Sequence, residues 1–239
     1  MGWKQSLLYT VCSRRFVDSL KAEPRLIKSR LLCLSPWNLA AILRLRKQAS
    51  LQLNIGAGEH VVAGWNNIDL VNSRHGFRWD LRWRIPLKDC SVSKIHCEHV
   101  LEHLDYPDEA LKFLNECHRL LRTDGELRLI IPDVLKYIQA YTGGNFHFWD
   151  QFKDLGNTAK PFETEMEIIN QCFRMGGDHR FAYDYKTVNT LLTKAGFVHI
   201  KKTDYCPGNF LDQGDSWRLS ESLYLTVTKE NDQRLQKAG

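Results

Sequence analysis

Short runs of alternating apolar and polar residues begin at residue 51 and recur along the chain. Residues 51–55 read Leu-Gln-Leu-Asn-Ile, which is the two-residue period of a strand, and a glycine turn follows at residues 56–58. Similar short runs lie at residues 66–70, 94–97, 126–131, 197–200 and 222–227. The pattern therefore predicts a series of short strands from residue 51 onward.

Two longer segments between these runs have the spacing of amphipathic helices. Residues 107–121 begin with Pro and two acidic residues, carry leucines at helical spacing and end with arginines, an order that the helix dipole favours. Residues 184–195 form a second such segment, and Gly196 follows as a C-terminal cap. Because strands that alternate with helices are typical of βαβ units, we predict an α/β fold with a mainly parallel sheet.

Two other regions depart from this pattern. Residues 1–48 predict a basic helical extension, broken near Ser35-Pro36, which either packs on the main domain or contacts an anionic membrane or another polyanion. Residues 142–180 contain Gly and Pro breaks and many aromatic residues, so we expect an irregular insertion that forms a lid or binds substrate. The main domain is then residues 49–230, followed by a solvated tail at 231–239.

The charge of the chain is concentrated at its N-terminus. The formal net charge is +5, of which residues 1–50 carry +8 and the other 189 residues carry −3. The high overall pI therefore gives no support for nucleic-acid binding by the main domain. A weak contact of the basic N-terminal region with a membrane surface stays open, and the sequence predicts no particular oligomeric state.

Cysteine usage and hydropathy indicate the compartment. The seven cysteines include no C-x-x-C pair, which suits reduced thiols better than a disulfide framework. No stretch approaches the roughly 20 apolar residues that a membrane-spanning helix needs. We therefore predict a cytoplasmic protein, with a membrane-peripheral location as the variant that the basic N-terminus allows.

The segment His-Cys-Glu-His-Val-Leu-Glu-His-Leu, at residues 96–104, is the richest in chemically active side chains. His99, Glu102 and His103 have the H-x-x-E-H spacing with which one class of metalloprotease holds zinc and activates water. A zinc hydrolase needs a third protein ligand, and this segment follows a strand so closely that its first half is not helical. The zinc hydrolase is therefore the less favoured hypothesis, and we predict no metal ligands.

The order of motifs around this segment supports a different hypothesis. A glycine turn after the first strand lets the backbone approach a ligand, and an acid after the second strand suits the ribose hydroxyls of a nucleoside. Here the turn is Gly56-Ala57-Gly58, the acid is Asp69, and a further acid, Asp80, follows. The full G-x-G-x-x-G of dinucleotide enzymes is absent, which argues against redox chemistry with a dinucleotide.

Taken together, these motifs resemble a known family. The series L-N-I-G-A-G, G-W-N-N-I-D, H-V-L-E-H-L and L-R-T-D-G-E-L-R-L-I-I-P-D is similar to that of the class I S-adenosylmethionine-dependent methyltransferases, in particular their compact subgroup with LN-G-G and G-W-x-N-x-D motifs. The resemblance covers about residues 50–135 and, more loosely, the closing strands. It implies a Rossmann-like, doubly wound, mostly parallel sheet with a C-terminal antiparallel strand pair, and S-adenosylmethionine as the cofactor.

The resemblance also implies positions around the cofactor. The glycine turn would line its methionine and ribose side, and Asp69 would hold the ribose hydroxyls. Asp80 and Leu81 would meet the adenine edge, and residues 97–99 would border the methyl-transfer chamber. The predicted cofactor-binding residues are thus Asn54, Gly56, Ala57, Gly58, Asp69, Leu70, Asp80, Leu81, Cys97 and Glu98.

The expected activity is methyl transfer to an unidentified acceptor, either a small molecule or a glycan-type substrate. Transfer from a sulfonium needs mainly positioning and a dry site, and a hydroxyl acceptor also needs a base. Glu98, His99 and His179 are the candidate catalytic residues, because each lies at a predicted strand exit or in the insertion.

One departure from the family leaves an alternative open. Residues 57–65 leave little room for the crossover helix, since a parallel connection usually needs a dozen or more residues. Asn54 and His60 also stand near the positions where the family often has an acid and a third glycine. The alternative is therefore a non-catalytic nucleoside-binding or scaffold protein of the same fold.

Overall fold

The computed structural model describes residues 14–71, 75–152, 162–206, 208 and 210–230. The predicted tail at 231–239 lies outside the described residues, as do residues 1–13 of the predicted extension and residues 153–161 of the predicted insertion.

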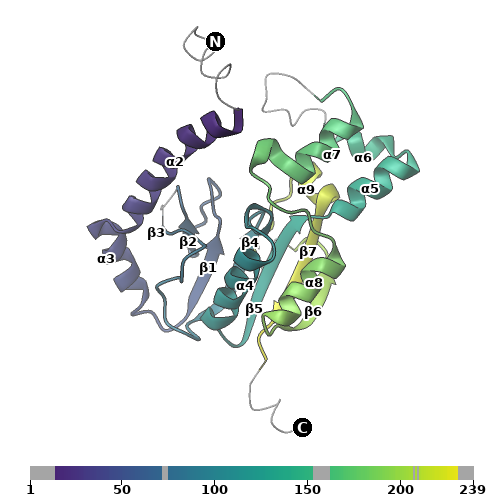
Figure 1. The fold of residues 1–239 in the computed structure, drawn as a ribbon. Helices are drawn as coiled ribbons and strands as arrows, with labels where there is room; N and C mark the ends of the chain where they lie inside the picture. The colour runs from purple at the N-terminus through teal and green to yellow at the C-terminus, as the bar shows by residue number, and fades with distance from the viewer. Residues whose placement is uncertain (1–13, 72–74, 153–161, 207, 209, 231–239) are drawn as a thin grey trace.

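The described residues form a seven-stranded sheet in the order β3-β2-β1-β4-β5-β7-β6 (Figure 1). Strands β1 to β5 run parallel to their neighbours, whereas β7 is antiparallel to both β5 and β6. This arrangement confirms the predicted α/β fold with a mostly parallel sheet and a C-terminal antiparallel pair. The strands are β1 (Leu51–Ile55), β2 (Asn66–Asp69), β3 (Gly76–Arg78), β4 (Val92–Glu98), β5 (Leu121–Pro132), β6 (Val198–Thr203) and β7 (Ser222–Thr228).

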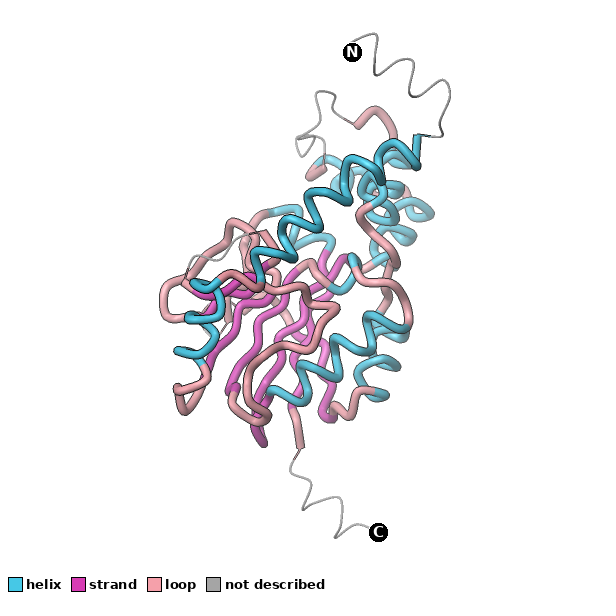
Figure 2. The backbone as a smooth tube through the Cα atoms, turned by 60° about the vertical axis from the view of Figure 1, so that its left-hand side comes forward, coloured by secondary structure: helices cyan, strands magenta, loops and turns pink. Residues whose placement is uncertain are grey.

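The helices are distributed unevenly around this sheet. In Figure 1, α4 and α8 cover the front of the sheet, α2 and α3 flank its β3 edge, and α5, α6, α7 and α9 gather above the end of β5. Figure 2 shows α2 running obliquely past the strands. The helices are α2 (Arg14–Cys33), α3 (Pro36–Leu45), η1 (Leu101–His103), α4 (Asp108–Leu120), α5 (Val134–Gly143), α6 (Phe146–Asp150), α7 (Glu165–Arg174), η2 (Met175–Gly177), α8 (Tyr185–Lys194) and α9 (Ser216–Glu221).

The predicted elements of the main domain agree closely with these bounds, but the insertion does not. Strand β1 has the predicted bounds, and α4 and α8 differ from the predicted helices by one residue at each end. The expectation of an irregular insertion is wrong for its described part, because α6 and α7 lie there. Helix α7 begins at a capping box in which the side chains of Thr164 and Glu167 accept each other's backbone N–H groups.

The N-terminal helices pack against the edge strand β3. The side chain of Asn38 donates to the carbonyl of Arg78 at 2.9 Å and accepts the N–H of Arg78 at 2.7 Å. Cys33, Ile42 and Leu45 are buried in the main hydrophobic core. Helix α3 therefore covers an edge that would otherwise expose unpaired backbone groups.

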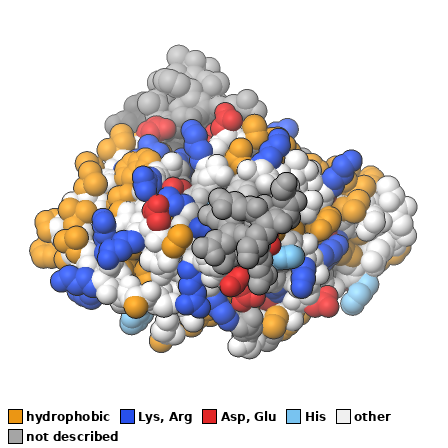
Figure 3. Space-filling model, turned by 90° about the horizontal axis from the view of Figure 1, so that it is seen from below, with side chains coloured by type: hydrophobic (Ala, Val, Ile, Leu, Met, Phe, Trp, Pro, Cys, Tyr) orange, Lys and Arg blue, Asp and Glu red, His pale blue; other side chains and the backbone are white. Residues whose placement is uncertain are grey.

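The outer surface of α2 and α3 is apolar. Leu31, Trp37 and Leu43 are 65%, 82% and 60% exposed, and in Figure 3 apolar side chains gather along the left-hand edge, the side on which α3 lies in Figure 1. No single described helix is long and apolar enough to cross a membrane, although residues 23–33 and α3, bent by 53°, meet that criterion as a pair. Membrane contact by this surface stays a prediction, as does the cytoplasmic location.

The two faces of the central strands differ in chemistry. Leu127 and Leu129 of β5 lie in the hydrophobic core that α4 and α8 cover, whereas Arg128 between them points to the opposite face. Arg128 is 1% exposed; its Nε donates to Asp212 Oδ1 at 3.0 Å and its Nη2 to the carbonyl of Asp204 at 2.7 Å. A buried ion pair therefore fixes the loop between β6 and α9 on this face.

Replacing Asp212 with Ala should lower the free energy of unfolding by about 3–5 kcal/mol, because it leaves the buried Arg128 guanidinium without its counter-charge. Urea denaturation measures this loss. The matched control is Arg84→Ala, which removes an exposed ion pair with Asp89 and should cost about 0–1 kcal/mol. Equal losses for the two variants would contradict the role given to Arg128.

Candidate functional site

The glycine turn and Asp69 lie together at the carboxyl ends of β1 and β2. Gly56 has a φ of 72°, and a Cβ there would lie 2.1 Å from Val100 Cγ2, so this position requires glycine. Gly58 has a φ of 50° and open space where a Cβ would project. Its N–H donates to Asp69 Oδ2 at 3.0 Å, and the N–H of Val71 donates to Oδ1 at 2.7 Å. The carboxylate is thus held beside the turn.

Asn54 ties the same turn to β2. Its buried side-chain amide donates to the carbonyl of His60 and to Asn67 Oδ1, each at 2.9 Å. Residues 56–65, which connect β1 to β2, contain no helix. A carboxylate at position 54 could not donate these bonds. The side-chain amide of Asn54 therefore holds the short connection against β2, where a crossover helix is absent.

A cavity of about 570 Å³ opens beside the turn. Ligands of open α/β sheets bind outside the carboxyl ends of the strands, and this cavity occupies that position. It is lined by residues 56–60 after β1, by Glu98, His99, Glu102 and His103 after β4, by Pro132, Tyr137, Phe152, Phe162, Ile168, Gln171, Cys172, Met175 and His179, and by Gln213, Trp217, Arg218 and Glu221.

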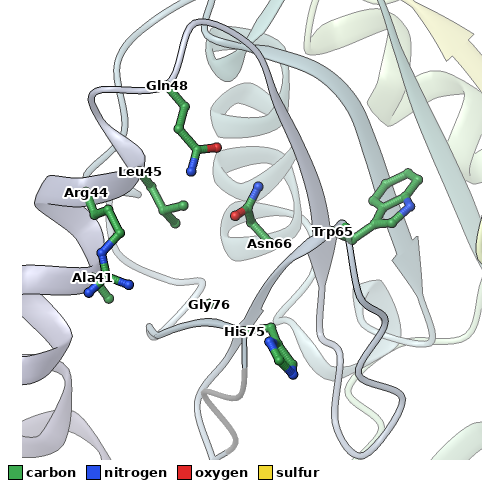
Figure 4. Close-up of a pocket in the computed structure, with 9 residues that line it drawn as sticks. Ala41, Arg44, Leu45, Gln48, Trp65, Asn66, His75 and Gly76 are labelled. Atoms are coloured by element: carbon green, nitrogen blue, oxygen red, sulfur yellow. The ribbon is translucent and has the colours of Figure 1, made fainter.

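A second cavity of about 570 Å³ lies between α3 and the sheet (Figure 4). Arg44 and Gln48 line it on one side, and Asn66 and Gly76 on the other. Asn66 and Gly76 are the first residues of β2 and β3, so this cavity lies at the amino ends of the strands. We therefore place the functional site in the cavity beside the glycine turn.

Asp80, predicted at the adenine edge, is engaged by the N-terminal helix. It is 1% exposed, and its carboxylate accepts Arg30 Nε of α2 at 2.8 Å and the backbone N–H of Arg82 at 3.0 Å. Burial acts to raise the pKa of Asp80, but these bonds and charges outweigh it and lower the pKa. The structure thus links α2 to the segment directly after β3, where the predicted adenine contact Asp80 lies.

The other predicted cofactor residues divide between the cavity and the core. Leu70, Leu81 and Cys97 pack in or against the hydrophobic core, and none of them lines the cavity. Burial raises the pKa of the Cys97 thiol well above its usual range, which makes it unreactive. The predicted residues that do line the cavity are Gly56, Ala57, Gly58 and Glu98.

Glu98, at the end of β4, is held as a carboxylate. It is 7% exposed, lies 3.3 Å from His96 Nε2 and accepts Arg218 Nη1 at 2.9 Å. Burial acts to raise the pKa of Glu98, but the contact with His96 and the charge of Arg218 outweigh burial and lower it. An ionised, paired carboxylate is a weak base, so the geometry suits Glu98 to orienting Arg218.

His99 lies between two carboxylates. Its backbone is left-handed, with a φ of 52°, and its Nδ1 lies 3.2 Å from Glu102 Oε1. Nε2 lies 3.3 Å from Ser222 Oγ and 3.8 Å from Glu221 Oε1. Burial acts to lower the pKa of His99, but the interactions with Glu102 and Glu221 outweigh burial and raise it. The His99 ring also meets the Trp217 ring in an edge-to-face arrangement, with centroids 5.8 Å apart.

Glu221 is a buried titratable residue of the cavity that the sequence analysis did not identify. It is 5% exposed, and burial raises its pKa to about 7. The hydroxyl of Tyr137 donates to its Oε2. Glu221 ends α9 within Trp-Arg-Leu-Ser-Glu, which matches no catalytic motif, so only the fold brings it to the cavity.

His179 lies in the cavity beside His103. The two rings meet edge to face with centroids 4.9 Å apart, and burial lowers the pKa of His179. Glu102, His103 and His179 place their ligand atoms within 4.8 Å of one another. The zinc-hydrolase hypothesis combined His99 with His103, but the structure turns His99 toward Glu102 and Glu221, and it is His179 that meets His103.

A family comparison agrees with this geometry. Residues 77–129 match the family model described as a methyltransferase domain. The match runs from β3 through Asp80, β4, the 96–104 segment and α4 into β5. The centre of the chain therefore matches a methyltransferase domain, which agrees with its resemblance to the class I S-adenosylmethionine-dependent methyltransferases.

The chain is also similar, at low identity, to solved structures. A possible histamine N-methyltransferase from Thermotoga maritima is 17% identical over 90% of this chain and 97% of its own, with a TM-score of 0.44. A methyltransferase from Methanosarcina mazei is 16% identical over 80% and 98%, with a TM-score of 0.46. Phosphoethanolamine N-methyltransferase 2 from Haemonchus contortus is 12% identical over 82% of this chain and 52% of its own, with a TM-score of 0.43. This chain thus spans about half the length of some of these proteins. A search of curated proteins found no match.

The residues around the turn fit S-adenosylmethionine, the cofactor of this class. The open space at Gly58 lets a ligand approach the backbone. The carboxylate of Asp69 is held beside the turn by the backbone bonds described above, and a carboxylate is an acceptor suited to ribose hydroxyls. Asp69 does not line the cavity itself but contacts Gly58, which does, and the same cavity is also lined by His99 and Glu221.

Replacing Asp69 with Ala should weaken S-adenosylmethionine binding by roughly 10- to 100-fold, since hydrogen bonds to a charged group contribute about 1.5–3 kcal/mol. Isothermal titration calorimetry on the methyltransferase measures this change. Asp89→Ala, which removes an exposed carboxylate, is the matched control and should bind like the wild type. An unchanged Kd for Asp69→Ala would show that the cofactor does not use this acid.

The raised pKa of Glu221 should make stability depend on pH. An ordinary glutamate has a pKa of 4.5, and burial raises the pKa of Glu221 to about 7, so between these values the folded protein keeps a proton that the unfolded chain releases. This contribution to the free energy of unfolding is fully present below about pH 4.5 and is lost as the pH rises through about 7. Relative to wild type, Glu221→Gln should therefore gain stability between pH 5 and pH 8 in urea denaturation. A stability difference that is independent of pH would contradict the raised pKa.

Proposed function

We propose that this methyltransferase methylates a hydroxyl group of a small molecule or of a short glycan-type acceptor bound in the cavity beside the glycine turn. The observation that carries the proposal is Glu221, a buried carboxylate with a pKa of about 7 that lines the same cavity as the turn. A hydroxyl must lose its proton when it is methylated, and a base works best when its pKa is near the working pH.

The size and lining of the cavity support an acceptor of this class. Small-molecule sites have volumes of about 300–1,000 Å³ and combine apolar walls with a few polar groups, and this cavity measures about 570 Å³. Phe152, Phe162 and Trp217 supply apolar walls. Glu98, Glu102 and Glu221 bring carboxylates, which accept hydrogen bonds from hydroxyl groups.

The chain contributes positioning and proton removal. S-adenosylmethionine supplies a methyl group that is already activated on its sulfonium. Glu221 accepts the hydroxyl proton, and Tyr137 holds its other oxygen in place. The contacts with Glu102 and Glu221 raise the pKa of His99, which suits its ring to orienting the Glu221 carboxylate.

The helices above the sheet place an aromatic cluster beside the site. Tyr137 of α5 packs against Phe148, Trp149 and Phe152 in a second hydrophobic cluster, with ring centroids 5.2, 6.4 and 5.6 Å away. A dry cavity strengthens the electrostatic interactions inside it and keeps water from competing with the acceptor. This cluster supports the expectation that the insertion forms a lid.

The alternative of a non-catalytic scaffold is less favoured on energetic grounds. A carboxylate buried where its pKa rises to about 7 lowers stability at neutral pH, and ligand binding alone does not require it. Such strained titratable groups are typical of active sites.

The test is an acceptor screen with the purified full-length chain and S-adenosylmethionine. Hydroxylated small molecules and oligosaccharides are scored by S-adenosylhomocysteine release and by the mass of a methyl group added to the acceptor. Once an acceptor is found, Glu221→Gln should lower kcat/KM by about 100-fold or more. The activity of the wild type should fall below about pH 7, and the residual activity of the variant should lack this pH dependence.

The matched control is Glu163→Gln, an exposed carboxylate at the edge of the same lid, which should retain wild-type activity. Full activity of Glu221→Gln, or methylation of nitrogen acceptors only, would overturn the proposal.

A further inference from the structure

Three side chains with metal-binding atoms meet at one side of the cavity, and the proposed methyl transfer does not use them as a group. The ligand atoms of Glu102, His103 and His179 lie within 4.8 Å of one another. Glu102 and His103 belong to η1, directly after β4, whereas His179 follows η2, far along the chain. All three line the cavity.

The backbone holds each imidazole through the same nitrogen. His103 Nδ1 lies 3.2 Å from the carbonyl of Asp178, and His179 Nδ1 lies 2.6 Å from the carbonyl of Cys172. A carbonyl only accepts, so Nδ1–H donates in both rings and Nε2 is left with a lone pair. Histidines that bind metals have this arrangement, in which the second nitrogen donates to a carbonyl or a carboxylate.

Glu102 completes the set with a negative charge that lacks hydrogen-bond donors. It is 1% exposed, and neither of its carboxylate oxygens has a hydrogen-bond partner among the described residues. His99 Nδ1 lies 3.2 Å from Oε1 as an ion-pair contact. The other oxygen, Oε2, is buried without a hydrogen-bond partner among the described residues, so it is the atom that a metal cation would satisfy.

We infer that Glu102, His103 and His179 form a binding site for a divalent transition-metal cation. Two imidazole nitrogens and one carboxylate are the donor set of metal sites that keep open coordination positions. Bonds of about 2.0–2.2 Å would draw the three atoms closer together, which rotation of the two partly exposed imidazoles permits.

The open positions of such a cation would face the cavity that the glycine turn also lines. A cation there lowers the pKa of an oxygen ligand by acting as a Lewis acid. On the proposed function, on which this step rests, the acceptor hydroxyl binds at an open position and Glu221 takes its proton. The oxygen then forms its bond to the methyl carbon as the carbon–sulfur bond breaks, and S-adenosylhomocysteine leaves.

The experiment uses Mn²⁺ as the probe, because this hard cation binds poorly to the free cysteines of the chain. The purified full-length protein, freed of metal by a chelator, is titrated with Mn²⁺ while free Mn²⁺ is followed by electron paramagnetic resonance. We expect one equivalent to bind, with water proton relaxation enhanced because open positions hold water. His103→Ala and His179→Ala should each weaken binding about tenfold or more. His147→Ala, an exposed histidine of α6, is the matched control.

The outcomes distinguish a metal-binding site from a cluster of side chains that only stabilises the fold. Loss of binding in His103→Ala and His179→Ala, with circular dichroism unchanged and His147→Ala unaffected, would support the metal site. No stoichiometric Mn²⁺ or Zn²⁺ binding by the wild type, or binding that survives both substitutions, would overturn it. These measurements of metal binding need no acceptor, so they test the metal site even if the proposed hydroxyl acceptor is wrong. If the protein methylates a hydroxyl group equally well in the presence of a chelator, the catalytic role of the metal is refuted and the proposed function is not.

Discussion

The hydrogen bond from the N–H of Gly58 to the carboxylate of Asp69 is the contact around which the site is arranged. The connection from β1 to β2 is too short for a crossover helix. Side-chain hydrogen bonds therefore hold this connection in place. Asp69 and Asn54 close the connection at both ends and hold the backbone of the turn open to a ligand. A cofactor that meets this turn meets a rigid surface.

Several titratable side chains lie close together at the carboxyl ends of the strands, beneath the helices of the lid. Glu98, His99 and Glu102 leave β4 together, and α9 adds Glu221. Because all four line one cavity, each modifies the proton affinity of its neighbours: the pKa of His99 is raised, that of Glu98 is lowered, and that of Glu221 lies near neutrality. The aromatic cluster of α5 and α6 packs beside this end of the sheet, and burial together with neighbouring charges shifts pKa values in opposite directions.

The sequence predicted those parts of the molecule that local patterns encode. The strand at 51–55, the helix at 107–121 and the glycine turn depend on nearby residues, and the structure has them at or within one residue of the predicted positions. It did not predict α6 and α7, whose apolar faces pack with α5 and with Trp217 of α9, or β3, which is three residues long. Glu221 and the meeting of His103 with His179 depend on distant segments being brought together. The roles assigned to Asp80 and Leu81 stay predictions.

A crystal structure of the full chain with S-adenosylhomocysteine tests the central claim most directly. We predict ribose hydroxyls within hydrogen-bonding distance of the Asp69 carboxylate, with the sulfur directed into the cavity that His99 and Glu221 line. A ligand bound in the second cavity, or a ribose that does not contact Asp69, would contradict the account.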